Sequence, residues 1–151
     1  MSSLLGLLFV FHLFLLPAPQ LHPIIYRPVT LALVISFLSW DTTDLHPYQD
    51  GIVDNNGVLI QAPYNCGDFS ANLVKSARQQ GIDAQMVGIL FKHAVGHAIV
   101  AFKTTDAGII YVEPQSDNIY TNVMVGSLLC THDQNLCMGD GELIREIINH
   151  D

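Results

Sequence analysis

The sequence predicts an α+β domain in which one core helix packs on a small antiparallel sheet, preceded by a hydrophobic N-terminal leader. The chain has 151 residues, half of them hydrophobic, which is enough for one core and too few for two domains. Residues 65–80 carry apolar side chains at the spacing of an amphipathic helix. Three short β-rich runs separated by polar turns follow that helix, which is typical of an antiparallel meander.

The leader is the apolar run MSSLLGLLFVFHLFLL, which a Pro-Ala-Pro segment closes. Roughly 13 apolar residues match the hydrophobic region of a signal peptide better than a membrane span of about 20. No Lys or Arg precedes the run, and Pro19 suits a cleavage site poorly, so an uncleaved anchor and a buried helix are the alternatives. We expect residues 1–19 to be a signal peptide or N-terminal membrane anchor and residues 24–151 to form a single domain. The protein is then secreted or membrane-anchored, on the extracytoplasmic side.

The net charge of the chain argues against a nucleic-acid partner. Fourteen acidic and six basic side chains give a charge of -8, and the basic residues are scattered along the sequence. Binding to nucleic acid or to an anionic membrane surface needs a basic patch. We therefore expect no nucleic-acid partner, and membrane contact only as a tether through the N-terminal segment.

Two segments connect the leader to the predicted core helix. Residues 28–40, PVTLALVISFLSW, are too few to span a membrane, and Pro28 suits a first helical turn, so we predict a buried core helix. Residues 47–64 form a connection rich in Gly, Asn and Asp. Within it, residues 54–57 (DNNG) indicate a turn and residues 58–60 a short strand.

The predicted core helix over residues 65–80 has clear signals at both ends. Asn65 is a good N-cap, Asp68 stands three residues later as in a capping box, and Gly81 follows the last helical residue. Cys66 is then the first helical residue.

The rest of the chain reads as strands. We predict a meander of three strands over residues 84–91, 97–102 and 108–113, and a fourth strand over residues 123–129. The tail, residues 140–151, fits either a last strand or a short helix.

The chain has three cysteines, at positions 66, 130 and 137. Cys130 and Cys137 flank a polar loop and are the natural disulfide pair in an exported protein, which leaves Cys66 as a free thiol. Three reduced, inert cysteines are the alternative.

Cys66 is the candidate nucleophile. A free thiol has a pKa of about 8.5, and a helix N-terminus lowers it because the unpaired N–H groups and the helix dipole favour the thiolate. The same N–H groups can stabilise the oxyanion of a tetrahedral intermediate.

His97 and Glu113 are the candidate base and its orienting acid. The strands predicted over residues 97–102 and 108–113 form a hairpin, in which the numbers of two facing residues have a constant sum. If that sum is 210, His97 lies directly opposite Glu113, and residues 104–106 form a three-residue loop. Any even sum places both side chains on one face, because side chains alternate along a strand. Directly opposed Cβ atoms lie about 5 Å apart, within reach of a hydrogen bond between these side chains.

The stretch YNCGDFSANLVKSARQQGIDAQMVGILF, followed by GHAIVAFKTTDAGIIYVEPQSD, resembles the core of transglutaminase-like domains. These belong to the papain-like cysteine peptidase superfamily, and the likeness is to its short prokaryotic forms. In that family a Cys opens the core helix, a His opens a strand, and an acid just before Pro ends the next strand. The resemblance covers residues 64–117 and implies a truncated papain-like core.

Carried over residue by residue, the resemblance implies that Cys66 is the nucleophile, His97 the general base and acid, and Glu113 the residue that orients His97. The family usually has Asp where this chain has Glu113, so the hairpin must accommodate an extra methylene. Asp117 is the fallback acid. Gln61 is a possible oxyanion-hole donor, although its spacing from the Cys does not quite match the family.

The implied reaction is acyl transfer from a peptide or protein amide, with no cofactor and no metal. The thiolate attacks the carbonyl, the His protonates the leaving amine, and a second nucleophile resolves the thioester. Water makes the protein a cysteine peptidase or amidase, and an amine makes it a transglutaminase. No feature of the sequence chooses between them.

Two other interpretations compete. Each of the three candidate residues, taken alone, is more often structural, so a catalytically inactive domain that keeps the fold for binding is the first alternative. The second is a metal site formed by the histidines and cysteines at positions 93, 97, 130, 132 and 137, although they lack paired spacing.

Overall fold

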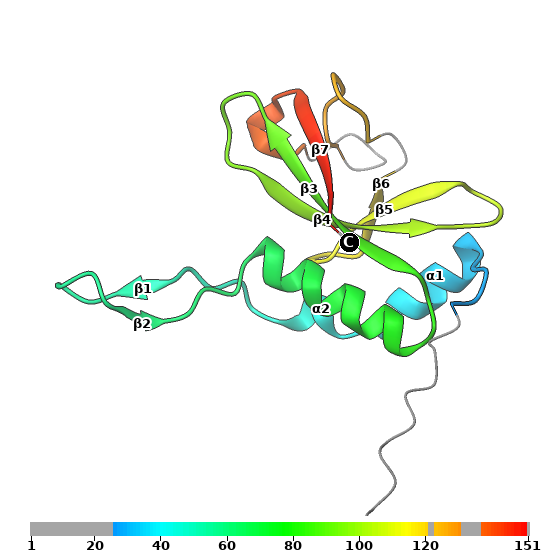
Figure 1. Ribbon diagram of the computed structural model, residues 1–151, viewed down its shortest axis with the longest axis horizontal. Coiled ribbons are helices and arrows are strands. Elements are labelled where there is room, and N and C mark those ends of the chain that lie inside the picture. The colour runs from blue at the N-terminus through cyan, green and yellow to red at the C-terminus, as the bar shows by residue number, and fades with distance from the viewer. Residues whose placement is uncertain (1–25, 121–122, 131–136, 151) are drawn as a thin grey trace, which may run out of the picture.

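The structure is a computed structural model that describes residues 26–120, 123–130 and 137–150. Within these ranges the chain is α+β, with two helices, a five-stranded antiparallel sheet and a separate two-stranded sheet (Figure 1). The leader expected over residues 1–19 lies outside the described ranges. None of the described helices is long and apolar enough to cross a membrane.

The large sheet has the strand order β6-β5-β4-β3-β7. Its strands are β3 (Ala84–Phe91), β4 (His97–Lys103), β5 (Ile109–Glu113), β6 (Asn118–Tyr120) and β7 (Ile144–His150). The predicted meander of β3, β4 and β5 is therefore confirmed. The tail forms a strand that pairs with β3, so of its two predicted forms the strand is correct.

The strand predicted over residues 123–129 is wrong. Gly126 has a φ of 86°, and the Ser127 hydroxyl donates to the Met124 carbonyl, so this stretch forms a turn. It contributes only an isolated bridge between Leu128 and Leu143. The short strand β6 was not predicted.

The two helices are α1 (Leu31–Leu38) and α2 (Cys66–Gln79). The bounds of α2 agree with the predicted core helix, and Gly81 follows it with a φ of 73°. The expectation for α1 needs correction, because it starts after the Thr30 cap rather than at Pro28. Only one side of α1 is buried, since Leu33 and Ile35 are 45% and 50% exposed.

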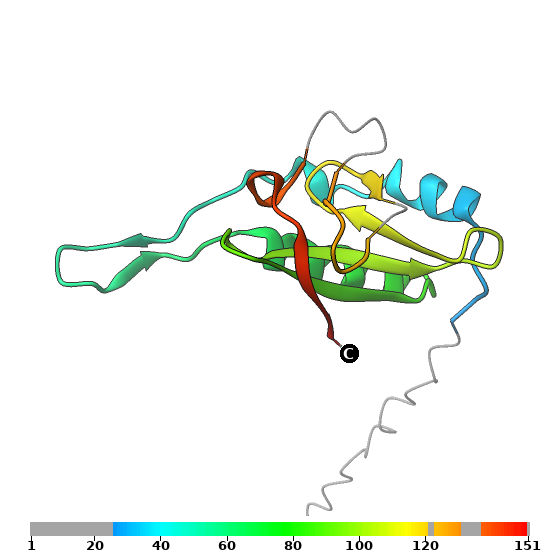
Figure 2. The same ribbon diagram turned by 90° about the horizontal axis from the view of Figure 1, so that it is seen from above.

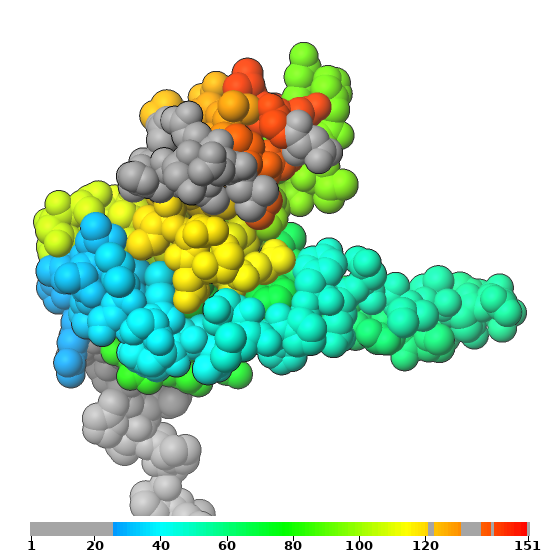
Figure 3. All heavy atoms as spheres, turned by 180° about the vertical axis from the view of Figure 1, so that it is seen from behind, coloured from blue at the N-terminus to red at the C-terminus, as the bar shows by residue number. Residues whose placement is uncertain are grey.

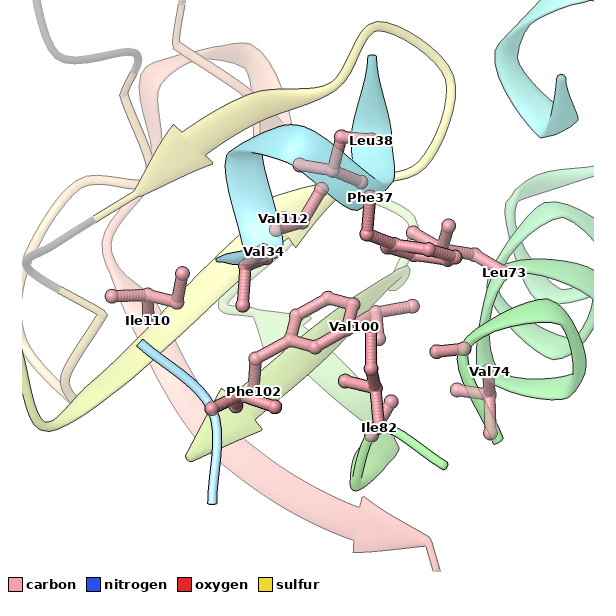
Figure 4. Close-up of a cluster of buried hydrophobic side chains, with 13 residues drawn as sticks. Val34, Phe37, Leu38, Leu73, Val74, Ile82, Val100, Phe102, Ile110 and Val112 are labelled. Carbon is pink, nitrogen blue, oxygen red and sulfur yellow. The ribbon is translucent and has the colours of Figure 1, made fainter. Parts of the chain in front are cut away.

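The core has two parts, one on each face of the sheet. On one face, α1 and α2 pack against β4 and β5, with Phe37 and Leu73 meeting Val100 and Phe102 (Figure 4). On the other face, Val87, Ile89 and Ile99 pack with Tyr120, Leu129 and Ile144. The Cys130–Cys137 disulfide closes the segment that carries Leu129, as predicted, and Cys66 is free.

A hairpin of β1 (Ile52–Val53) and β2 (Leu59–Gln61) projects from the body, as three views show (Figures 1, 2 and 3). Its turn is built on Asp54, whose carboxylate accepts backbone N–H groups of the next residues. At its base, Gln49 and Tyr64 exchange two backbone hydrogen bonds. The base of the hairpin is therefore followed directly by the start of α2.

Candidate active site

The thiol of Cys66 lies at the N-terminus of α2, held there by a capping box. The Asn65 side chain accepts a hydrogen bond from the Gly67 backbone N–H (2.9 Å), and the Asp68 carboxylate accepts one from the Asn65 N–H (2.9 Å). This cap is the one that the sequence predicts. Cys66 is therefore the first helical residue, and it is partly buried.

The register of the β4–β5 hairpin differs from the predicted one by two residues. Val100 faces Val112 and Phe102 faces Ile110, so facing numbers sum to 212 rather than 210. The cause is the turn: Thr104 hydrogen-bonds to the carbonyl of Gly108, which has a φ of 71°, so the loop comprises residues 105–107. The sum is still even, and the two candidate side chains therefore share one face of the sheet.

Because of this register, Glu113 lies diagonally across from His97 instead of directly opposite. Glu113 Oε2 is 2.5 Å from His97 Nε2, and Glu113 Oε1 accepts the backbone N–H of Gln115 at 3.4 Å. The side chains of His97 and Glu113 are only 12% and 2% exposed. Diagonal Cβ atoms are about 7–8 Å apart, so the extra methylene of Glu provides the reach that this register requires.

The His97 ring also interacts with the Cys66 side chain, and this interaction is the largest influence that lowers the pKa of the thiol. Cys66 opens α2 and His97 opens β4, so the thiol and the imidazole meet where these two elements begin.

The surroundings shift both pKa values toward a thiolate and an imidazolium. The hydrogen bond from His97 lowers the pKa of Cys66, and backbone N–H groups of Ala98 and Gly67 lower it further, against the opposing effect of burial. Burial opposes the charge on His97, but hydrogen bonds to Cys66 and Glu113 and the charges of both outweigh it and raise the pKa of His97 to about 9. This pairing favours the nucleophilic form of the thiol at neutral pH.

Three features of the site were not predicted from the sequence. The Ala98 N–H, next to the base, points at the thiol. Tyr120 lies close enough to Glu113 that burial, and then the Glu113 charge, raises the pKa of the phenol. The Glu142 carboxylate accepts the backbone N–H groups of His93 (2.5 Å) and Ala94 (3.2 Å), which fixes the turn that leads into His97. Of these three features, only the Ala98 N–H could have been expected from the sequence, because Ala98 directly follows the candidate base His97.

The two secondary candidates lie elsewhere. The amide of Gln61 donates to the Gln49 side chain within the projecting hairpin (3.4 Å). Asp117 sits in the β5–β6 turn with a φ of 56°, and burial together with the charges of Asp44 and Asp41 raises its pKa to about 6. The acid that contacts His97 is Glu113.

The described residues offer no group of three or more His, Cys, Asp or Glu placed to hold a metal ion. Cys130 and Cys137 are joined in the disulfide, so neither provides a thiolate ligand. His132 lies outside the described ranges.

No model of a known protein family matches the chain, and no curated protein matches it either. The geometry of the site is therefore the basis for the chemistry proposed below.

Proposed function

We propose that this protein is a thiol-dependent acyl-transfer enzyme with a truncated papain-like core of the transglutaminase-like kind. Its substrate is an amide bond of a peptide or protein. The observation that carries the proposal is the His97–Glu113 pair beside a thiol whose pKa it lowers, with that thiol at a capped helix N-terminus.

In the proposed reaction the Cys66 thiolate attacks the amide carbonyl carbon, and a C–S bond forms while the π electrons move to the oxygen. The N–H group of Ala98, which lowers the pKa of the thiol, is the candidate for stabilising that oxyanion. When the intermediate collapses, the C–N bond breaks and His97 gives its proton to the leaving amine. Water, deprotonated by His97, then hydrolyses the thioester to an acid, or an amine converts it to a new amide.

The test is acylation of the thiol. We expect p-nitrophenyl acetate to release nitrophenol in a burst, with one acetyl group on the peptide that contains Cys66 by mass spectrometry. Cys66→Ala should abolish the burst, and His97→Ala should slow it about 100-fold or more. Adding glycine methyl ester separates the two outcomes, because an N-acetyl product indicates amine transfer and acetate indicates hydrolysis. A wild-type burst no faster than that of Cys66→Ala contradicts the proposal.

One observation favours a second candidate, a catalytically inactive domain of the same fold. The Gln61 amide donates to the Gln49 side chain, so the residue expected to act as the oxyanion-hole donor is engaged within the projecting hairpin. An inactive domain is expected to show stable acetylation of Cys66 without turnover.

The disulfide supports the proposal that the protein works outside the cytoplasm, with the leader as a signal peptide or membrane tether. Disulfides persist in oxidising compartments and are rare in the cytosol.

A further inference from the structure

A pocket of about 440 Å³ lies between α2 and the edge of the sheet, away from the thiol. It arises because α2 covers β3 and β4, while β7 extends the sheet beyond the helix. Its lining residues are Ala71, Val74, Lys75, Arg78, Gln79, Met86 and His150. Cys66, His97 and Glu113 take no part in it.

The lining of this pocket combines an apolar wall with two cations. Ala71, Val74 and Met86 provide the wall, and Lys75 and Arg78 stand one turn apart on α2. The whole chain has only six Lys and Arg against fourteen acidic residues. Among the residues that the structure describes, no Asp or Glu lines this pocket.

No carboxylate of the described residues forms a salt bridge with either cation. Within the described ranges the only salt bridge joins His97 and Glu113. Arg78 Nε donates to the Ala84 carbonyl (3.1 Å), which anchors the guanidinium beside the pocket and leaves its other N–H groups as donors. Arg78 and Lys103 also line a neighbouring hollow of about 350 Å³, together with Asp83. This corner of an acidic protein therefore concentrates half of its basic side chains.

We propose that this pocket binds an amphiphilic anion, a carboxylate on an alkyl chain, with the chain against Val74 and Met86 and the carboxylate between Lys75 and Arg78. A pocket of this volume lies within the range that accommodates small ligands. A guanidinium binds a carboxylate in a planar, two-pronged geometry, which favours this head group. The inference does not depend on the acyl-transfer proposal, because no residue is shared.

Isothermal titration calorimetry of the full chain with decanoate, below its micelle concentration, tests the proposal. We expect saturable one-to-one binding of decanoate, and much weaker binding of both decanol, which lacks the charge, and butyrate, which lacks the tail. The same affinity in Cys66→Ala is expected, since the thiol is elsewhere. No saturable binding of decanoate, or equal binding of decanol, overturns the proposal.

Variants at exposed positions of α2 locate the site. Lys75→Gln should weaken decanoate binding about three- to five-fold and Lys75→Glu more strongly, because an exposed charge pair contributes modestly. Ala71→Phe fills the pocket and should abolish binding. Lys92→Gln removes the same charge from the β3–β4 turn and is the matched control with unchanged affinity. Lys75 is exposed on α2, so Lys75→Gln and Lys75→Glu should fold normally. These two variants therefore test the site even if Ala71→Phe fails to fold. Unchanged affinity in Lys75→Glu overturns the assignment of the pocket.

Discussion

At the scale of single residues, the identity of Glu113 follows from the hairpin register. Glu113 and His97 share a face of the sheet but are offset by two residues along it, since facing numbers sum to 212. The longer Glu side chain crosses that diagonal and places its carboxylate 2.5 Å from the imidazole. An Asp would suit a directly opposed pair. The presence of Glu at this position therefore has a geometric reason.

This geometry predicts that Glu113→Asp is as damaging as Glu113→Ala. The shortened carboxylate no longer reaches His97 Nε2, so His97 loses the hydrogen bond that orients the ring and helps to raise its pKa. We expect acetylation of Cys66 to slow by about 100-fold in either variant, measured as the nitrophenol burst. Glu113→Gln keeps the reach without the charge and is expected to retain more activity than Glu113→Asp. Full activity of Glu113→Asp contradicts the diagonal geometry.

The charged form of Asp117 lowers the free energy of unfolding, and a single substitution can remove this effect. Burial and the neighbouring Asp44 and Asp41 raise its pKa to about 6, so the charged form destabilises the folded state at neutral pH. Asn also tolerates the positive φ at this position. Asp117→Asn should therefore raise the free energy of unfolding at pH 7.5 by about 1 kcal/mol, after allowance for solvent screening.

The pH dependence of that gain is the check. The folded-state pKa is raised, so the penalty is fully present above about pH 6 and disappears as the pH falls toward the unfolded value of 3.8. Urea unfolding of both proteins should give a difference at pH 7.5 and none near pH 4. A constant difference across this range contradicts the assigned cause.

At the scale of elements, the cap of α2 links stability to reactivity. Asn65 accepts the Gly67 N–H, and the same helix terminus favours the Cys66 thiolate. We expect Asn65→Ala to lower the free energy of unfolding by about 1 kcal/mol and to slow alkylation of Cys66 at pH 7. Asn65→Ser keeps a capping hydroxyl and should stay close to wild type in both measurements. Equal losses in the Ala and Ser variants would indicate that the cap is not responsible.

Elements with strong local signals were predicted from the sequence. The capped helix α2 has an N-cap, a capping box and a terminal glycine, and β3 to β5 have regular β-rich runs between polar turns. The three-residue β6 and the turn over residues 123–129 lack such signals, because their conformation depends on Tyr120 and Leu129 packing against the sheet. The register of the hairpin depended on which residues formed its turn, which only the structure shows.

At the scale of the whole molecule, the disulfide stabilises the segment that covers the sheet face opposite the helices. Cys130 and Cys137 are seven residues apart, and Leu129 beside them is fully buried. The double variant Cys130→Ser/Cys137→Ser should lower the free energy of unfolding by about 2 kcal/mol in urea denaturation. Acetylation of Cys66 in the folded variant should be unchanged. Loss of acetylation with the fold intact would show that this segment supports the site.

The arrangement of distant parts of the chain was the least predictable feature. Pairing of β7 with β3 joins residues almost sixty positions apart, and the tail itself fitted a strand or a helix equally well. The candidate site was nevertheless predictable, because the capped Cys, the strand-opening His and the strand-ending acid each carry a local signal. Gln61 and Asp117 were weaker candidates because their roles depend on tertiary position alone.

In the proposed mechanism, His97 makes Cys66 a nucleophile. The most direct measurement is the rate of Cys66 alkylation by iodoacetamide from pH 5 to 9, in wild type and in His97→Ala. Because the pKa of Cys66 is lowered, the wild-type rate should reach half its maximum at a pH below the ordinary thiol value of about 8.5. Removing His97 should move that midpoint upward toward 8.5 and slow alkylation at pH 7. A wild-type midpoint near 8.5, unaffected by His97→Ala, would contradict the account.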